Sequence, residues 1–266
     1  HFLRDPVTNE RRAVPVTLDL IGDRYVFDPE KFEASITPRT RLFILCNPHN
    51  PTGNVWQRDE LVAIAEICLR KGIIVVSDEV HQDFVFEPAR HVAWGTLDEP
   101  FVQNAVICTA PSKTFNLAGL QCANNFIPNP VLRDAFLRQC QKIGLARLNT
   151  LAVAACEAAY RECDDWLRAM LNYVQGNKRH FAGRLNELGL LVKALPSDAL
   201  YLSWLDFRRV GLSPAELHDF LLRRSRLWLD PGTKFGPGGA GFMRINLACP
   251  RRLVDLAIER LASTLP

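Results

Sequence analysis

Short apolar runs alternate with a helical segment in the first half of the chain, and this alternation limits the possible folds more than any other feature. Arg41–Asn47 is an apolar run that ends in a polar turn, and Ile73–Ser77 and Ala105–Ala110 have the composition of buried strands. Between the first two runs, Asp59–Arg70 carries apolar side chains at helical spacing, and Gly72 ends the helix. This order is typical of a parallel sheet covered by helices on both faces. We therefore predict a three-layer α/β/α domain with a mainly parallel sheet.

The second half of the chain has a different pattern. It contains two mostly helical stretches, two strand-like pieces, and two further helices: Ala152–Tyr160, Asp165–Leu188, Leu200–Asp206, Phe242–Leu247, Pro214–Arg224 and Arg251–Ser263. Mixed strands and helices of this kind indicate a smaller α+β domain. We place the boundary inside the connecting helix, which gives a large domain at residues 1–168 and a small C-terminal domain at residues 169–266.

Composition excludes several classes of protein. The net charge is only +3 and the basic residues are spread along the chain, so we expect neither nucleic acid nor an anionic membrane as a partner. The hydrophobic runs are too short to span a bilayer. Eight cysteines form no CxxC pair and no zinc-ligand spacing, so we expect packing roles, no metal, and a reducing, cytoplasmic location.

Polar side chains follow three of the predicted strands. They are Asn47–Asn50 (NPHN), Asp78–His81 (DEVH) and Ser112–Lys113 (SK). Ligands of α/β sheets bind at the carboxyl ends of the strands. The convergence of these three groups from distant parts of the sequence therefore indicates a binding site.

Lys113 and Asp78 are the candidates for chemistry. A lysine at the mouth of a buried sheet loses hydration, which favours a neutral amine that can act as nucleophile and base; an isolated loop lysine would instead face solvent. A carboxylate directly after a buried strand needs a cationic partner or several donors. Asp78 could hold a protonated ring nitrogen, or it could cap a turn.

Three further residues have two possible roles each. His81 could donate a hydrogen bond to a ligand oxygen or serve as a structural histidine. The turn around Asn50 could orient a cofactor hydroxyl with the Asn50 amide or be an ordinary loop. Arg244 lies in an apolar strand pattern, so its guanidinium requires an anion, either a bound carboxylate or an internal salt bridge.

Four segments together resemble a known family. CNPHNPTG, SDEVHQDF, TAPSKTFNLAGL and FGPGGAGFMRINLACP are similar to the motifs of aminotransferase class I/II, fold-type I enzymes that use pyridoxal 5′-phosphate. The combination of NPHNPTG, SDE-x-H and APSKTFN most resembles the cystathionine β-lyases of the MalY and PatB type. The likeness extends from about residue 10 to the C-terminus, and the order and spacing of the motifs make it specific.

The resemblance implies a role for each candidate residue. Lys113 would bind the cofactor covalently, and Asp78 would pair with its pyridinium nitrogen. Asn50 and His81 would contact the 3′-oxygen, and Ser112 would lie near the phosphate. Arg244 would bind the α-carboxylate of a small amino-acid substrate. By the same resemblance we expect a homodimer.

The chain departs from the family pattern in two ways. Many aminotransferases of this fold carry an arginine eight residues after the lysine and a serine three residues before it; this chain has Gln121 and Ala110. Relatives also have a preceding segment with a phosphate-binding glycine loop and an aromatic residue that stacks on the cofactor ring, and we expect that part of the large domain to be missing from this chain.

These observations favour a C–S β-lyase that cleaves cystathionine or related cysteine thioethers to a thiol, pyruvate and ammonia. The loss of a phosphate-binding arginine counts against a transaminase, which must retain a cofactor that is not covalently held for half of its cycle. An aminotransferase remains the first alternative. A catalytically impaired or truncated regulatory homologue is the second.

Overall fold

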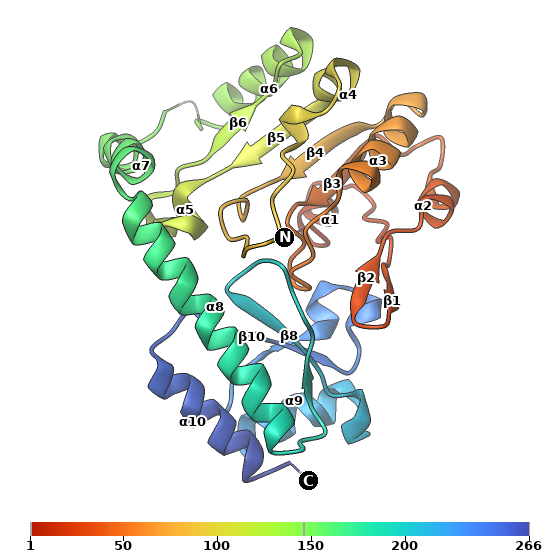
Figure 1. The fold of residues 1–266 in the computed structure, drawn as a ribbon. Coiled ribbons are helices and arrows are strands. Elements are labelled where there is room, and N and C mark those ends of the chain that lie inside the picture. Colours follow the sequence, from red (N-terminus) through yellow and green to blue (C-terminus); the bar gives the residue numbers. More distant parts are fainter. Residues whose placement is uncertain (1, 146, 266) are drawn as a thin grey trace. The chain divides into compact units, whose positions relative to one another are not determined.

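The computed structural model describes residues 2–145 and 147–265, which form two compact units (Figure 1). We call one the parallel-sheet unit; it comprises Ile36–His49 and Val55–Met170. We call the other the antiparallel-sheet unit; it comprises His1–Ser35, Asn50–Asn54 and Leu171–Pro266. Each unit has its own sheet and its own buried side chains.

The parallel-sheet unit contains a four-stranded sheet of order β3-β4-β5-β6 (Figure 1). Its strands are β3 (Leu42–Cys46), β4 (Ile74–Asp78), β5 (Ala105–Thr109) and β6 (Asn124–Phe126). The first two pairings are parallel and the pairing of β5 with β6 is antiparallel. The mainly parallel sheet predicted from the sequence is therefore confirmed. The short edge strand β6 was not predicted, because NNF has no hydrophobic periodicity that would reveal a strand.

Helices connect and flank these strands. They are α3 (Arg58–Arg70), α4 (Glu99–Gln103), α5 (Pro111–Thr114), α6 (Pro130–Lys142), α7 (Thr150–Glu162), and the short 3₁₀ helices η1 (Trp94–Thr96) and η2 (Ala118–Leu120). Helix α3 begins with a capping box between Gln57 and Glu60, which satisfies backbone N–H groups of the first turn. It buries Leu61 and Ile64, two of the apolar residues whose spacing predicted the helix.

The antiparallel-sheet unit contains a hairpin and a second four-stranded sheet. The hairpin joins β1 (Asp19–Ile21) to β2 (Arg24–Val26); the sheet has the order β7-β8-β10-β9, with β7 (Lys193–Ala194), β8 (Leu202–Asp206), β9 (Asp230–Pro231) and β10 (Phe242–Asn246). All pairings in this sheet are antiparallel. The register places Arg244 of β10 between Trp204 of β8 and Asp230 of β9. This pairing determines which residues surround Arg244.

Helices complete this unit. They are α1 (Asp5–Thr8), α2 (Pro29–Ser35), α8 (Asp164–Glu187), α9 (Pro214–Arg223), α10 (Arg251–Ala262), and the 3₁₀ helices η3 (Arg208–Val210), η4 (Gly232–Phe235) and η5 (Pro237–Gly239); the first seven residues of α8 belong to the other unit. The core packs Phe181 and Leu185 of α8 with Leu217 and Leu221 of α9 and with Met243 of β10. This part of the chain therefore combines an antiparallel sheet with helices packed against it, which is the predicted α+β character. None of the helices in the described residues has both the length and the apolarity that a membrane span requires.

The first 35 residues pack differently from the sequence-based division, which placed them in the large domain. In the structure they belong to the antiparallel-sheet unit. The Tyr25 hydroxyl accepts a hydrogen bond from Trp204 Nε1 at 3.0 Å, and Lys193 forms an ion pair with Asp23 at 2.6 Å. Contacts between residues so far apart in sequence leave no local signal. The division into functional domains at residues 168 and 169 stays a prediction.

Candidate functional site

The carboxyl ends of three strands meet at one edge of the parallel sheet. The register aligns Cys46 at the end of β3 with Asp78 at the end of β4, and Asp78 with Cys108 of β5. The backbone N–H of Asn47 donates to the carbonyl of Asp78 at 2.9 Å. Helix α5 follows β5 after one residue, so the structure brings Asp78, Ser112 and Lys113 to this same edge.

Asp78 is partly buried, and its carboxylate has few compensating contacts. Its Oδ1 accepts the Val80 N–H at 3.2 Å. Burial raises the pKa of the Asp78 carboxyl; the Val80 N–H and the positive charge of Lys113 act in the opposite direction, and the charge of Glu79 adds to the rise. The carboxylate would therefore gain from a further cation. Lys113 lies near enough for its charge to act on Asp78, so the two groups can serve one ligand.

Lys113 is held on a short, well-anchored helix. The Thr114 hydroxyl donates to Asp83 Oδ2 at 2.7 Å, and the N–H of Phe115 donates to the Pro111 carbonyl at 2.9 Å. The Phe115 ring contacts Tyr160 edge-on, with 5.2 Å between ring centroids. These contacts fix the backbone on both sides of the Lys113 amine.

His81 lies in the turn that follows β4 and is buried. Its carbonyl accepts the Phe84 N–H at 2.9 Å, and the Gln82 N–H bonds to the Glu79 carbonyl at 2.9 Å. The turn is therefore closed by backbone hydrogen bonds. His81 is three residues after Asp78 in the chain, and both residues belong to the same unit as Lys113.

Asn50 and Arg244 lie together in the antiparallel-sheet unit. The Arg244 side chain is 18% exposed, and its Nη1 donates to Asn50 Oδ1 at 2.9 Å. Its Nη2 forms an ion pair with Asp230 Oδ2 at 2.6 Å, and the guanidinium lies 4.7 Å from the centre of the Phe235 ring. The internal salt bridge considered from the sequence is thus present. The buried Nε has no hydrogen-bond partner among the described residues, so the guanidinium retains capacity to bind an anion.

Asp230 was missed by the sequence-based reasoning. It pairs with both Arg244 and Lys234, the latter at 2.6 Å. The pKa of its carboxyl is lowered on balance, because hydrogen bonds and charge from the two basic groups outweigh its burial. Its only sequence signal is its position before Pro231, which indicates a turn and gives no hint of an ion pair.

The turn at residues 50–54 is attached to a second loop of the same unit. The Gly53 carbonyl accepts the N–H groups of Asp198 at 3.1 Å and Ala199 at 3.0 Å. Gly53 has a φ of +76°, and a β-carbon there would lie 2.5 Å from the β-carbon of Ser197. Glycine is therefore required where the backbone passes this close, which explains the last residue of NPHNPTG.

The available side chains fit two groups of pyridoxal phosphate that lie on opposite sides of its ring, the aldehyde and the ring nitrogen. An amine and an incompletely compensated carboxylate at one sheet edge suit its aldehyde and its ring nitrogen. Fewer groups suit the phosphate: Ser112 supplies a hydroxyl, whereas Gln121 is an uncharged residue in the left-handed conformation with φ of 53°. Among the described residues no group of three or more potential metal ligands occurs.

Comparison with known proteins decides the family. Residues 9–261 match the family model for aminotransferase class I and II. The chain belongs to the aminotransferase class I and II family. Cystathionine beta-lyase PatB of Bacillus subtilis is 42% identical over 266 residues, which cover 100% of this chain and 66% of PatB. Protein MalY of Escherichia coli is 32% identical over 259 residues, which cover 97% of this chain and 66% of MalY.

A solved structure supports the same assignment. Cystalysin from Treponema denticola, whose crystal structure contains a pyridoxal 5′-phosphate cofactor, matches with a TM-score of 0.94 and 32% identity. The match covers 97% of this chain and 67% of cystalysin. This aminotransferase class I and II chain therefore has the fold-type I architecture, and both the fold class and the likeness to PatB and MalY predicted from the motifs are confirmed. It spans slightly less than two thirds of PatB and MalY.

Proposed function

We propose that the protein is a pyridoxal-phosphate-dependent C–S β-lyase that acts on cystathionine or related cysteine thioethers. The observation that carries the proposal is the placement of Lys113 and Asp78 at one edge of the parallel sheet, within electrostatic reach of each other. The 42% identity to PatB along the whole chain supports a lyase among the activities of this family. The net reaction adds water to the thioether amino acid and yields a thiol, pyruvate and ammonium.

We assign cofactor-binding roles to residues of the parallel-sheet unit. Lys113 would bind the cofactor aldehyde through its amine, Asp78 would keep a proton on the ring nitrogen, and His81 would face the 3′-oxygen. Ser112 would donate to the phosphate. When bound, pyridoxal phosphate supplies an electron sink for the negative charge that develops at the substrate Cα.

Lys113 and Arg244 would act on the substrate, Lys113 as a base and Arg244 as the group that binds its carboxylate. The Lys113 amine would be the base that takes the proton from the substrate Cα. The Arg244 guanidinium, which is oriented by Asn50 and Asp230, would bind the α-carboxylate. Asn50 would also contact the 3′-oxygen of the cofactor. Loss of the thiolate from Cβ then follows from the charge that proton removal leaves on Cα.

Borohydride reduction followed by mass spectrometry tests the cofactor assignment. The full-length protein is incubated with pyridoxal phosphate, reduced and digested, and we expect one modified peptide that carries the cofactor on Lys113. Lys113→Ala should lose both the label and the absorbance of the bound cofactor near the visible edge. A label on another lysine, or an unchanged spectrum in Lys113→Ala, would refute the assignment.

An aminotransferase is the second candidate, favoured by the family model that matches the chain. Incubation with cystathionine separates the two activities. Release of a thiol and pyruvate in the absence of a 2-oxo acid supports the lyase, whereas transfer of the amino group to an added 2-oxo acid supports the transaminase. A protein that binds the cofactor at Lys113 but shows neither activity would support the remaining alternative, a catalytically impaired or truncated regulatory homologue.

We further propose that the protein is a cytoplasmic homodimer. The cytoplasmic location is supported by the eight cysteines, all of which are free thiols. Helix α6 supports self-association, because it buries none of its side chains in the described chain and exposes Val131 and Leu137. Sedimentation velocity of the full-length protein measures the oligomeric state, and a monomer at micromolar concentration would contradict the dimer.

A further inference from the structure

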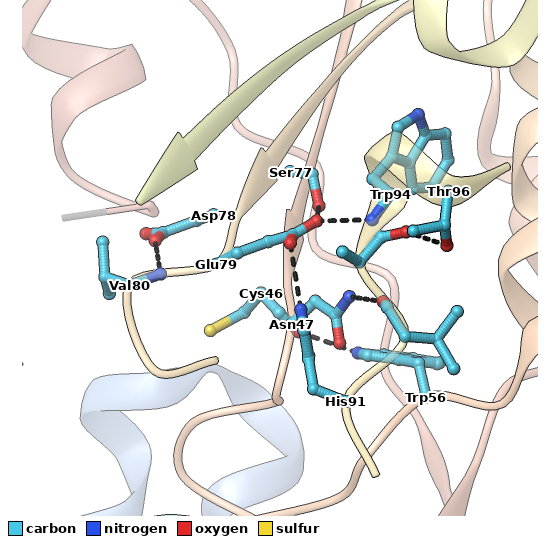
Figure 2. Close-up of polar contacts among 12 residues, drawn as sticks. Cys46, Asn47, Trp56, Ser77, Asp78, Glu79, Val80, His91, Trp94 and Thr96 are labelled. Atoms are coloured by element: carbon cyan, nitrogen blue, oxygen red, sulfur yellow. Dashed lines mark hydrogen bonds and ion pairs between the residues drawn. The ribbon is translucent and has the colours of Figure 1, made fainter. Parts of the chain in front are cut away.

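Glu79 is the most buried carboxylate of the site edge, with 1% of the residue exposed. Figure 2 shows that both of its oxygens are engaged. Oε1 accepts hydrogen bonds from the Ser77 hydroxyl at 2.8 Å and from the Trp94 backbone N–H at 2.9 Å, and Oε2 lies 2.9 Å from His91 Nε2. A carboxylate so deep in the protein is costly unless several donors compensate it, and this one has three.

These contacts tie the end of β4 to the segment that follows it. Trp94 is fully buried, and the carbonyl of Val92 accepts the Asn47 side-chain amide at 3.0 Å (Figure 2). The Glu79 N–H donates to the Cys108 carbonyl of β5 at 2.7 Å. Glu79 therefore joins β4 to β5 through its backbone and to residues 91–94 through its side chain. Its immediate neighbour in the chain is Asp78.

Glu79 also acts on Asp78 electrostatically. Its negative charge contributes to the raised pKa of the Asp78 carboxyl, after the larger effects of burial and the Val80 N–H. A second negative charge beside Asp78 makes the site more favourable for a cation. The cation would be the protonated ring nitrogen that Asp78 faces under the proposed function.

We propose that Glu79 is a positioning residue for Asp78: clamped by Ser77, Trp94 and His91, it fixes the Asp78 carboxylate at the sheet edge and supplies a second negative charge that retains the proton of the cofactor ring. This role rests on the proposed function, because it concerns the same cofactor. It differs from a purely structural role because the charge of Glu79, and not only its shape, is required.

Two variants separate charge from hydrogen bonding. Glu79→Gln removes the charge but can still accept from Ser77 and Trp94. Its amide can face His91 Nε2 as a donor, because the buried His91 Nδ1 has no hydrogen-bond partner among the described residues that would dictate the tautomer. Ser77→Ala is the matched control, since it removes one hydrogen bond from Glu79 and leaves the charge.

The readouts are the dissociation constant of pyridoxal phosphate and the pH midpoint of the bound cofactor's absorbance change. For Glu79→Gln we expect affinity to fall about tenfold and the midpoint to fall by about one pH unit, because a proton is held less tightly without the nearby negative charge. For Ser77→Ala we expect an unchanged midpoint. A wild-type midpoint and affinity in Glu79→Gln would overturn the proposal, and so would an equal shift in Ser77→Ala.

A third variant covers the case in which Glu79→Gln does not fold. Glu79→Asp keeps the charge but shortens the side chain, so we expect faster hydrogen exchange at the Trp94 amide in the cofactor-free protein and cofactor affinity at least about fivefold weaker. Wild-type exchange and affinity in Glu79→Asp would overturn the clamp. If the wild-type protein itself binds no cofactor at Lys113, the proposed function fails first, so the two failures are distinguishable.

Discussion

Lys178 on α8 offers a quantitative test of the antiparallel-sheet unit. Its ammonium donates to the backbone carbonyls of Ala199 at 3.2 Å, Leu200 at 2.9 Å and Leu202 at 2.7 Å. Burial lowers the pKa of Lys178 to about 7, and the charge of Asp198 acts in the opposite direction. The first two carbonyls belong to the loop at residues 198–200, and N–H groups of this loop donate to the Gly53 carbonyl, so Lys178 supports the turn that contains Asn50.

The sign of the pH effect follows from this lowered pKa. An unfolded lysine has a pKa of about 10.4, so between pH 7 and that value the unfolded chain binds more protons than the folded one. The folded state therefore becomes more stable as the pH rises, and this contribution is lost as the pH falls through about 7. From pH 7 to pH 9 the gain is at most about 2 kcal/mol.

Urea unfolding of the wild type and of Lys178→Met at pH 7, 8 and 9, followed by circular dichroism, measures the effect. Because methionine does not titrate, the difference in unfolding free energy between the two proteins should change by about 2 kcal/mol in favour of the wild type over this range. The exposed Lys71→Met serves as the control for loss of one lysine charge. A difference for Lys178→Met that stays constant with pH would show that the three carbonyls hold the ammonium charged, and would refute the reasoning.

Two further substitutions test the scaffold around the site. Gly53→Ala should lower the unfolding free energy by at least about 2 kcal/mol, because the added methyl overlaps Ser197; Gly22→Ala, with a similar positive φ but open space, controls for backbone strain alone, and an equal loss in both would contradict the overlap. Asn177→Ala should cost about 3 kcal/mol in urea unfolding, because the buried Leu247 carbonyl, the partly buried Cys249 carbonyl and the Arg251 guanidinium lose their partner; a loss below about 1 kcal/mol would contradict this.

Local sequence predicted the strands β3, β4, β5, β8 and β10 and the helices α3, α7, α8, α9 and α10 to within a few residues, and it missed helix α6 and the shorter elements. The helix expected at Asp59–Arg70 is Arg58–Arg70, and the strand expected at Ile73–Ser77 is Ile74–Asp78. Both have a strong local signal, either helical spacing of apolar residues or a β-branched run. The hairpin of β1 and β2 was missed, because Arg24–Val26 is only three residues long and contains too few positions to show alternation.

The candidate site residues were also named from the sequence, but the side chains that contact them in the structure were not. Asp78 and Lys113 follow buried strands, and parallel pairing necessarily brings strand ends to one edge. The partner of Arg244 could not be foreseen, because Asp230 reaches it through antiparallel pairing of β9 with β10. Glu79 stood in the recognised motif, yet the role proposed for it depends on hydrogen bonds from His91 and Trp94, which lie more than ten residues later in the chain.

The sequence by itself determined the main strands and helices of both halves of the chain, the family, and the identity of the amine and carboxylate at the sheet edge. These follow from periodicity and from motifs, which are properties of neighbouring residues. Only the tertiary structure decided that residues 1–35 pack with the C-terminal half, that Asp230 pairs with Arg244, and that His91 and Trp94 enclose Glu79. The physical reason is that burial and ion pairing depend on which distant segments meet. Bringing distant segments together costs conformational entropy, and only the packing of the whole unit offsets that cost.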